Sequence, residues 1–437
     1  MTTTWKAAAL VAAGLSTAIA AGAQTPGSAP NQDAVPPETG ITVESITLGQ
    51  AIERALAQAP GVVGAALAAQ SAEALARQAR RLPNPEFFFD LEEAGGTGSL
   101  SGLDSAELTV GLTQVVEVGG DRRARMRVAS AVSESSELRL DLARRDLLRA
   151  VTISYYELLA GQERFAVADS LHALASRFHD TVTEQVAAGK ASPLDERRAL
   201  VLTSNTALER SDARIDLVMA QTHLSATLGD PEPVNYEAVG ALESDAPLPD
   251  PDLLVRTFEA GPHAMLWQKG VEAARNRAQL VRSERIPNVT LSVGGRRYRE
   301  LGESALTGTI AIPLPVFDRG TDAVRAADLA ASVEETKRED AFLQMRSRLA
   351  SLAKSVELTE EGITELRDRA IPAAQANLAA TMVGYREGKF DLTTVIGVER
   401  TLTELAMKLV DARLRHRLLH AEIDRIAAER GTDRRTP

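Results

Sequence analysis

Residues 81–84 read RLPN, and residues 285–288 read RIPN. Two further landmarks return at nearly the same separation of about 200 residues: the stretch 109–120 aligns with 309–320, and Gly189-Lys190 with Gly388-Lys389. A spacing that stays nearly constant through three landmarks indicates an internal duplication. The chain is therefore expected to consist of two halves with the same architecture.

Each of the two tetrapeptides ends a helix and precedes a pair of expected strands. The pairs cover residues 86–91 and 106–116 in the first half, and 288–298 and 305–314 in the second. Apolar residues alternate with small or hydroxylated ones, as in the stretch LTVGLT at 108–113. This alternation gives each strand one apolar and one hydroxylated face. Two interpretations remain open: an ordinary half-buried sheet, or a barrel wall with lipid outside and water inside.

Very long helices are expected to follow the strands. Between residues 121 and 186 the chain has no proline and only one glycine, Gly161. As a single helix, some 65 residues at 1.5 Å each would extend roughly 100 Å. The second half carries a coiled-coil seam with alternating 4-3 spacing, formed by Met345, Leu349, Leu352, Val356, Thr359, Ile363, Leu366 and Ala370. Pro372 is expected to kink this rod. Rods of such length favour the barrel interpretation.

Both rods are expected to end in a tight turn and return as a second helix. Gly189 and Gly388 suit the left-handed conformation that follows a helix. Ser192 then caps the returning helix, with Pro193 at its first position, and Asp391 caps the equivalent helix of the second half. Each half therefore predicts a helical hairpin.

Composition and the N-terminus limit the compartment and the chemistry. The chain has 437 residues, a net charge of −11 and no cysteine. The missing cysteine excludes disulfides, cysteine–zinc sites, thiol catalysis and a lipid-bearing cysteine, and the acidic balance argues against a nucleic-acid partner. Three features predict a secretory signal peptide: Lys6, the apolar stretch over 7–21, and an Ala-x-Ala signal that ends at Ala23. Cleavage is expected between Ala23 and Gln24. The mature chain is expected to be exported without lipidation.

These signals predict six consecutive segments. They are a signal peptide (1–23), a flexible lead-in (24–46), a first helix-strand-strand-long helix-helix repeat (47–228), a proline-rich linker (229–250), a second repeat (251–430) and a disordered tail (431–437). Four strands per chain cannot close a barrel, which takes about eight at minimum. Three copies would supply twelve strands and enough rods to close a tube.

The whole mature chain resembles the TolC-like outer-membrane factors, the exit ducts of Gram-negative tripartite efflux pumps. The resemblance lies in the duplication, the Pro-Asn stop before each first strand, and the Tyr385-x-x-Gly388 turn. The stretches YYELLA at 155–160 and AGKASPLDE at 188–196 look most like the CzcC-type branch, which serves heavy-metal pumps of the resistance-nodulation-division class.

The resemblance implies an α+β membrane protein: a homotrimer with a 12-stranded β-barrel in the outer membrane and a coiled-coil helical tunnel in the periplasm. It also implies two partners, a periplasmic adaptor and an inner-membrane transporter. Asp195, Glu196, Thr394 and Gly397 would line the periplasmic aperture. Since Thr394 and Gly397 are uncharged, a second acidic ring is missing. The adaptor-docking tips would be Gly189, Lys190, Ser192, Gly388, Lys389 and Phe390.

No catalytic motif is present, so no enzyme activity, cofactor or metal site is expected. His416 and His420 have the i,i+4 spacing of a metal-binding pair, but Arg415 and Arg417 flank the first and no cysteine completes a set, so a solvated helix face is the interpretation. The expected function is passive efflux of heavy-metal cations of the cobalt–zinc–cadmium or copper–silver class. Two alternatives remain: a duct for drugs or secreted polypeptides, and a non-channel periplasmic adaptor with a coiled coil.

Overall fold

The computed structural model describes residues 43–243, 247 and 250–427. The expected signal peptide, its cleavage site at Ala23 and Gln24, nearly all of the lead-in and the tail 431–437 lie outside these residues. In the first half the elements are β1 (Val43–Ile46), α1 (Leu48–Gln58), α2 (Pro60–Gln78), β2 (Glu86–Glu92), the 3-10 turn η1 (Gly98–Leu100), β3 (Glu107–Val116), α3 (Asp121–Ala187) and α4 (Pro193–Leu228).

The second half follows the same order. Its elements are β4 (Asn235–Ala238), α5 (Pro251–Glu259), α6 (Pro262–Ser283), β5 (Val289–Tyr298), β6 (Glu303–Ala311), α7 (Thr321–Glu365), the π-helical turn η2 (Leu366–Ala370), α8 (Ile371–Arg386) and α9 (Leu392–Ala427). The four strands expected from the sequence are present, with ends that differ by up to three residues.

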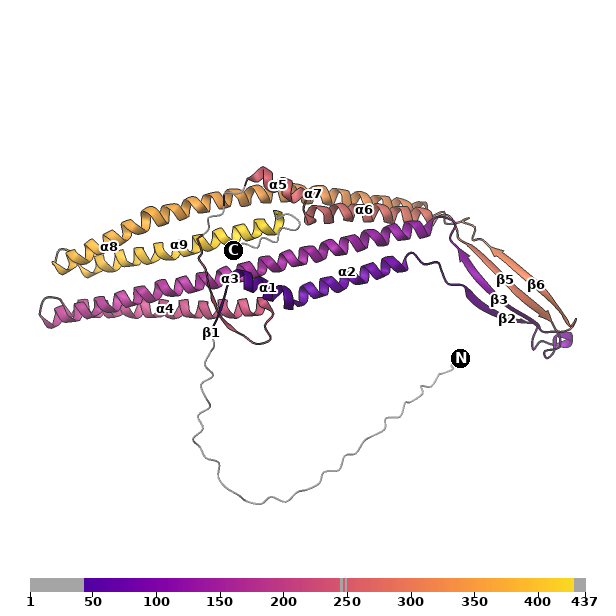
Figure 1. Ribbon diagram of the computed structural model, residues 1–437, viewed down its shortest axis with the longest axis horizontal. Coiled ribbons are helices and arrows are strands. Elements are labelled where there is room, and N and C mark those ends of the chain that lie inside the picture. Colours follow the sequence, from indigo (N-terminus) through magenta and orange to yellow (C-terminus); the bar gives the residue numbers. More distant parts are fainter. Residues whose placement is uncertain (1–42, 244–246, 248–249, 428–437) are drawn as a thin grey trace, which may run out of the picture. The chain divides into compact units, whose positions relative to one another are not determined.

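These four strands form one antiparallel sheet in the order β2-β3-β5-β6 (Figure 1). The central pair joins the two halves of the chain, with Gly111 of β3 opposite Gly294 of β5. Strands β2 and β6 are the edges of the sheet. Both halves therefore contribute equally to one continuous surface.

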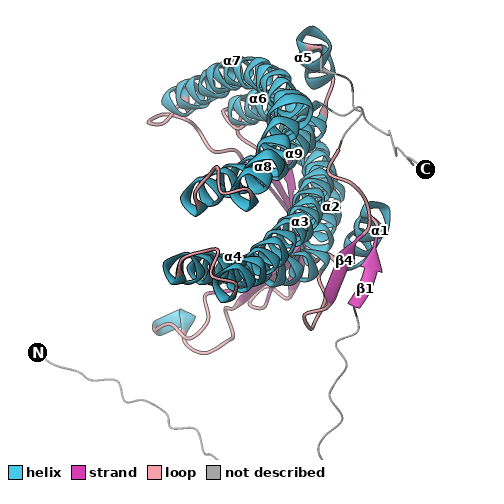
Figure 2. Ribbon diagram, turned by 90° about the vertical axis from the view of Figure 1, so that its left-hand side faces the viewer, coloured by secondary structure: helices cyan, strands magenta, loops and turns pink. Residues whose placement is uncertain are grey.

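The helices run side by side away from the sheet, and Figure 2 views them roughly along their length. The 67-residue α3 packs along α2, α4, α6 and α9, so that one unbroken helix contacts elements of both halves. Gly161 is the only glycine of α3, and it packs against Leu217 of α4. Among the helices of the described residues, none is both long enough and apolar enough to cross a membrane.

The lead-in (24–46) was expected to be flexible, which is wrong for its last four residues, and the proline-rich linker (229–250) contains a strand that was not predicted. Val43–Ile46 and Asn235–Ala238 form β1 and β4, a two-stranded parallel sheet. The pair is stable because its inward side chains are buried: Ile46 is 3% exposed and Tyr236 is fully buried, in the same core as Tyr155 and Leu158 of α3. The Tyr155 hydroxyl donates a hydrogen bond of 2.7 Å to the Val239 carbonyl. The two short strands were not predicted, because both segments are rich in proline and because the two strands that pair lie far apart in the sequence.

The expected kink before the end of the second rod is present as the π-helical turn η2, which separates α7 from α8. Pro372 follows at the start of α8. Proline has no N–H to donate to the preceding turn, and a widened turn accommodates its ring. The seam residues Leu349, Val356 and Ile363 are buried on α7, as their spacing predicts.

Candidate functional site

The four-stranded sheet has two chemically different faces. On one face Phe87, Leu112 and Val293 lie in register across β2, β3 and β5, and Val110 and Leu306 share this face. These side chains have no cover: Phe87 is 69% and Leu306 83% exposed. Large apolar side chains are usually withdrawn from water, so an exposed row of them marks a surface that another apolar medium or protein covers.

The opposite face is polar. Thr113 and Ser292, which lie opposite each other on β3 and β5, share a hydrogen bond of 2.8 Å. The Thr307 hydroxyl of β6 donates to the Gly294 carbonyl. The alternation expected from the sequence therefore places the threonine hydroxyls of these strands on a single face.

One aromatic ring interrupts this polar face. Phe88 of β2 lies over Gly111 of β3, and a Cβ added to Gly111 would come within 2.4 Å of the Phe88 ring. Gly294, opposite Gly111, is close to the Val110 carbonyl. Gly111 therefore leaves room for the Phe88 ring, and Gly294 allows the close approach of the β3 backbone.

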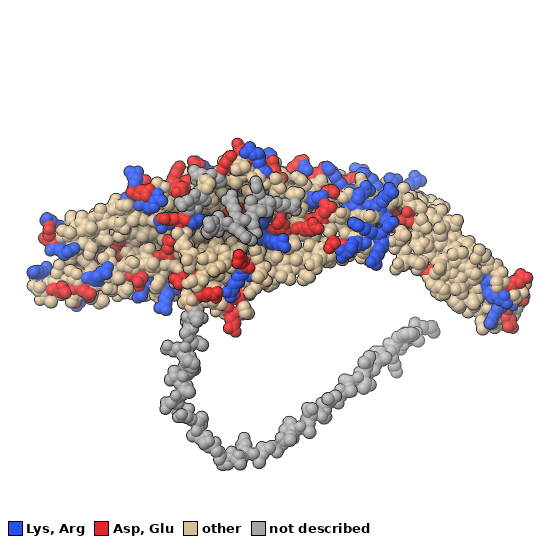
Figure 3. All heavy atoms as spheres, in the orientation of Figure 1, with Lys and Arg blue, Asp and Glu red and all other residues tan. Residues whose placement is uncertain are grey.

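Charge gathers at the end of the sheet that is remote from the helices. There the Arg296 guanidinium of β5 pairs with Glu92 of β2 and Glu107 of β3, each at 2.8 Å, and donates to the Thr109 hydroxyl at 2.9 Å. In Figure 3, Lys, Arg, Asp and Glu side chains are scattered over the helices and gather at the tip of the sheet, and few lie between. The Arg296 network was not predicted from the sequence, because its members come from three separate strands.

At the other end of the chain, the α3–α4 turn is fixed by helix-capping chemistry. Gly189 has φ 69°, and the Lys190 N–H donates to the Gln185 carbonyl. The Leu194 N–H donates to the Ser192 hydroxyl, and the Ser192 N–H donates to the Asp195 carboxylate at 3.3 Å, which closes a capping box. The carboxylate of Asp195 is therefore turned toward its own helix cap.

The α8–α9 turn repeats this geometry. Gly388 has φ 72°, and the Lys389 N–H donates to the Gly384 carbonyl. Asp391 accepts hydrogen bonds from the N–H and the hydroxyl of Thr394, and these bonds lower the pKa of the Asp391 carboxyl. The N-cap therefore lies three residues after the turn glycine in both hairpins, with a serine hydroxyl in the first and an aspartate carboxylate in the second.

The two hairpins meet near their tips. An apolar cluster joins them, formed by Ala175, Phe178, Val182, Ala199, Leu202, Leu392 and Val395. The Tyr385 ring lies 5.4 Å from that of Phe178, and burial together with the nearby Asp195 carboxylate raises the pKa of Tyr385. We call these seven residues the hairpin cluster.

The six expected docking residues lie on exposed surface at the two turns. Phe390 is 49% exposed, and its ring lies over Gly384, where an added Cβ would meet it at 2.3 Å. Of the expected aperture residues, Asp195 and Thr394 take part in the caps, and Glu196 accepts a 3.5 Å hydrogen bond from Thr183 of α3. Open space surrounds the Cβ position of Gly397. Arg198 lies 3.8 Å from Asp195, a neighbour that the sequence analysis did not single out.

His416 and His420 do not lie on a solvated face, and that interpretation is wrong. His416 is 3% exposed, because α9 turns this position toward α7. Burial is the main cause of a lowered pKa for both imidazoles. The flanking arginines suggested a wet surface, but they project to other sides of the helix: Arg417 stacks over Tyr156 and donates to the Leu242 carbonyl.

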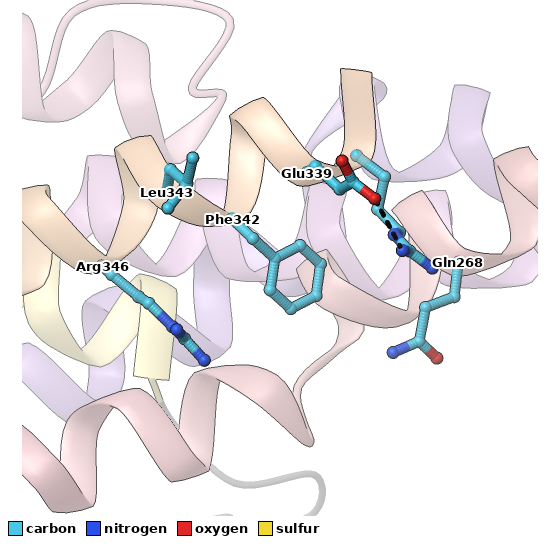
Figure 4. Close-up of a pocket in the computed structure, with 6 residues that line it drawn as sticks. Gln268, Glu339, Phe342, Leu343 and Arg346 are labelled. Atoms are coloured by element: carbon cyan, nitrogen blue, oxygen red, sulfur yellow. Dashed lines mark ion pairs between the residues drawn. The ribbon is translucent and has the colours of Figure 1, made fainter. Parts of the chain in front are cut away.

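A groove of 470 Å³ lies between α6 and α7 (Figure 4). It is lined by Gln268, Arg338, Glu339, Phe342, Leu343 and Arg346. Phe342 also packs against Phe258 and Trp267, with ring centroids 5.5 and 5.6 Å apart. The groove is therefore the outer surface of an aromatic packing cluster, and the charged residues at its rim do not converge on one point.

Comparison with known proteins identifies this architecture. Residues 51–230 match the outer membrane efflux protein family. The chain is 29% identical over 371 residues to the cobalt-zinc-cadmium resistance protein CzcC of Cupriavidus metallidurans, with 83% of this chain and 85% of that protein covered. It is 27% identical over 316 residues to the nickel-cobalt-cadmium resistance protein NccC of Alcaligenes xylosoxydans xylosoxydans, with 71% and 70% covered.

Solved structures agree on the fold. The outer-membrane channel OprN superposes with a TM-score of 0.76 at 20% identity, covering 87% of this chain and 89% of that one. The open state of the MtrE outer membrane channel of Neisseria gonorrhoeae superposes with a TM-score of 0.73 at 17% identity, covering 87% and 89%. The chain is thus similar to the outer membrane efflux protein family over residues 51–230 and to two metal-resistance proteins over most of its length, and its fold is the TolC-like fold of these channels.

Proposed function

We propose that three copies of this chain form the passive exit duct of a tripartite efflux pump for divalent heavy-metal cations. The observation that carries the proposal is the sheet, which has an exposed apolar face, a hydroxylated face and two open edges. Four strands are too few to close, whereas twelve strands from three copies exceed the minimum of about eight. Closure of this kind pairs each edge strand and places the apolar face against lipid.

The cargo is inferred from the relatives. CzcC is described as a resistance protein for cobalt, zinc and cadmium, and NccC as one for nickel, cobalt and cadmium. A passive duct needs no metal ligands of its own along the path, because selection belongs to the pump that feeds it. The rival cargoes are drugs and secreted polypeptides.

The hairpin tips would contact the periplasmic adaptor. Their exposed residues, Lys190, Lys389 and Phe390, offer charge and one aromatic ring for such a contact. Asp195 and Glu196 would contribute negative charge to the periplasmic aperture. In this proposal the chain is exported to the outer membrane of a Gram-negative bacterium. Its two repeats (47–228 and 251–430) both contribute strands and helices to the duct.

A susceptibility panel tests the cargo. A strain deleted for this gene and complemented in trans would be exposed to Zn²⁺, Cd²⁺, Co²⁺, Ni²⁺, Cu⁺ and Ag⁺, and to hydrophobic drugs and bile salts. We expect selective sensitivity to one or more metals. Sensitivity to drugs alone would agree with an efflux duct but would contradict the proposal that its cargo is a metal ion. Light scattering of the purified protein in detergent tests the assembly, for which three times the mass of the mature chain is expected.

Planar-bilayer recordings test the aperture. The double variant Asp195→Asn/Glu196→Gln is expected to lower the preference for cations over anions, because it removes two negative charges per chain. Asp212→Asn, at an exposed position further along α4, is the matched control. An unchanged reversal potential in the double variant would show that these two residues do not line the aperture.

A further inference from the structure

Two histidines on adjacent turns of α9 face α7 from inside the helical packing. The ring centroids of His416 and His420 are 4.6 Å apart. His416 is 3% exposed. The Nε2 atom of His420 is buried and has no hydrogen-bond partner among the described residues. A buried ring nitrogen without a partner is costly, so its persistence calls for an explanation.

A carboxylate approaches the pair from the opposite helix. Glu360 Oε2 of α7 lies 3.4 Å from His416 Nε2. This separation exceeds the usual 2.7–3.2 Å of an N–H···O hydrogen bond. It is the separation of two neighbouring ligands around a tetrahedral Zn²⁺ ion, which lie roughly 3.4 Å apart when each bond is about 2.1 Å.

The charges around the pair include both signs. Asp424 of α9 and Glu360 favour a cation near the imidazoles, and Arg417 opposes it. The Arg417 guanidinium is held elsewhere, 4.8 Å over the Tyr156 ring and hydrogen-bonded to the Leu242 carbonyl at 3.0 Å. Neutral imidazole is the form of histidine that binds metals.

We propose that His416 and His420 are a half-formed binding site for a divalent transition-metal ion, which Glu360 completes together with water. Within the described residues, no three side chains of this kind already surround a common point. Glu360 lies at ligand separation from His416 but not at a point that both imidazoles share, so metal binding requires a rotation of the Glu360 side chain, which is 39% exposed. Two imidazoles and one carboxylate suit Zn²⁺ and its first-row neighbours.

The site would act as a brace between two helices. A bound ion would tie α7 to α9 shortly before the π-helical turn η2, where the second rod changes direction. The proposal concerns a resident ion within the helical packing. It does not depend on which cargo passes through the duct.

Titration of the metal-free, full-length protein in detergent with Zn²⁺ alone tests the site by calorimetry. We expect one ion bound per chain. His420→Gln and Glu360→Gln are expected to weaken binding about tenfold or more, since each removes one ligand. His223→Gln is the control, because His223 is an exposed residue of α4 that pairs with Glu157. We avoid His416 because its deeper burial endangers folding.

A second readout separates ligand loss from misfolding. Zn²⁺ is expected to raise the melting temperature of the parent protein and of His223→Gln, and not that of His420→Gln. The metal-free variants must first melt close to the parent. If the parent binds no Zn²⁺ at micromolar concentrations, or if His420→Gln binds as tightly as the parent, the proposal is wrong.

Discussion

Gly111 and Gly308 are two glycines of the same sheet with opposite surroundings. Gly111 lies on the polar face, where a Cβ would meet the Phe88 ring at 2.4 Å and the Val293 carbonyl at 2.5 Å. Gly308 lies on the apolar face, where the nearest atom to an added Cβ is 4.0 Å away. The difference depends on the Phe88 ring of β2 and on the Val293 carbonyl of β5, which both come from neighbouring strands.

Gly111→Val is expected to destabilise the protein by about 1–3 kcal/mol, because the new side chain must displace Phe88 or the neighbouring strand. Gly308→Val is the matched control and is expected to change stability by less than about 0.5 kcal/mol. Thermal unfolding in detergent, followed by circular dichroism, measures both. Equal melting temperatures for the two variants would contradict the packing of Phe88 over Gly111.

Glu399 is a buried carboxyl of α9. It is 6% exposed and accepts a 3.2 Å hydrogen bond from Thr403. Burial raises its pKa, with Glu209 of α4 adding to the shift and Thr403 opposing it. Because its pKa is higher in the folded than in the unfolded protein, folding is favoured while the group is protonated, and this contribution is lost as the pH rises through the folded-state pKa.

Glu399→Gln should therefore melt a few degrees higher than the parent at neutral pH, and this gain should vanish below the ordinary glutamate pKa of about 4.3. Glu404→Gln is the control, because Glu404 is exposed on the same helix and pairs with Arg400. Melting curves across this pH range make the comparison. A gain that is independent of pH would assign the effect to packing and not to ionisation.

At the scale of the element, the alternation along β6 distinguishes two environments. Ile310 belongs to the apolar face and is 71% exposed, whereas its neighbour Thr309 lies on the hydroxylated face. The sequence predicted this division from the period of two. Single substitutions on each face test whether lipid or water covers that face.

Ile310→Lys is expected to reduce insertion into the outer membrane, since a lysine facing lipid costs about 2–4 kcal/mol at the bilayer midplane. Thr309→Lys, one residue away and facing the proposed aqueous interior, is expected to insert normally. Separation of inner and outer membranes on a sucrose gradient, with the protein detected by antibody, quantifies both. Equal loss of the two variants would argue against lipid on the apolar face.

At the scale of the whole molecule, the hairpin cluster holds the two halves together near the tips. Val395 of α9 is 3% exposed within this cluster. Val395→Ala is expected to cost about 1–2 kcal/mol of stability and to raise the resting conductance, because it weakens the contact between the hairpins. Val383→Ala, at a 49% exposed position of α8, is the control. Bilayer conductance and melting temperature test both, and an unchanged conductance would contradict a role for this contact in closure.

The sequence by itself determined the duplication, the four strands with their two faces, the long helices and the glycine turns. Each of these depends on residues close together in the chain: a period of two, a heptad seam, or a capping pair such as Ser192 and Asp195. Local physics decides such features, so they could be predicted. Pro372 predicted a kink near the end of the second rod, but the π-helical form of the turn that precedes it was not predicted.

Only the tertiary structure decided the features that join distant segments. The β1–β4 pair connects Val43 with Asn235, the Arg296 network draws on three strands, and the burial of His416 depends on α7. The candidate site divides in the same way, since the turns were predicted but the contacts of Asp195 with Arg198 and Tyr385 were not. Sequence patterns show which side of a helix is apolar, whereas the partner that covers that side is set by the packing of the whole chain.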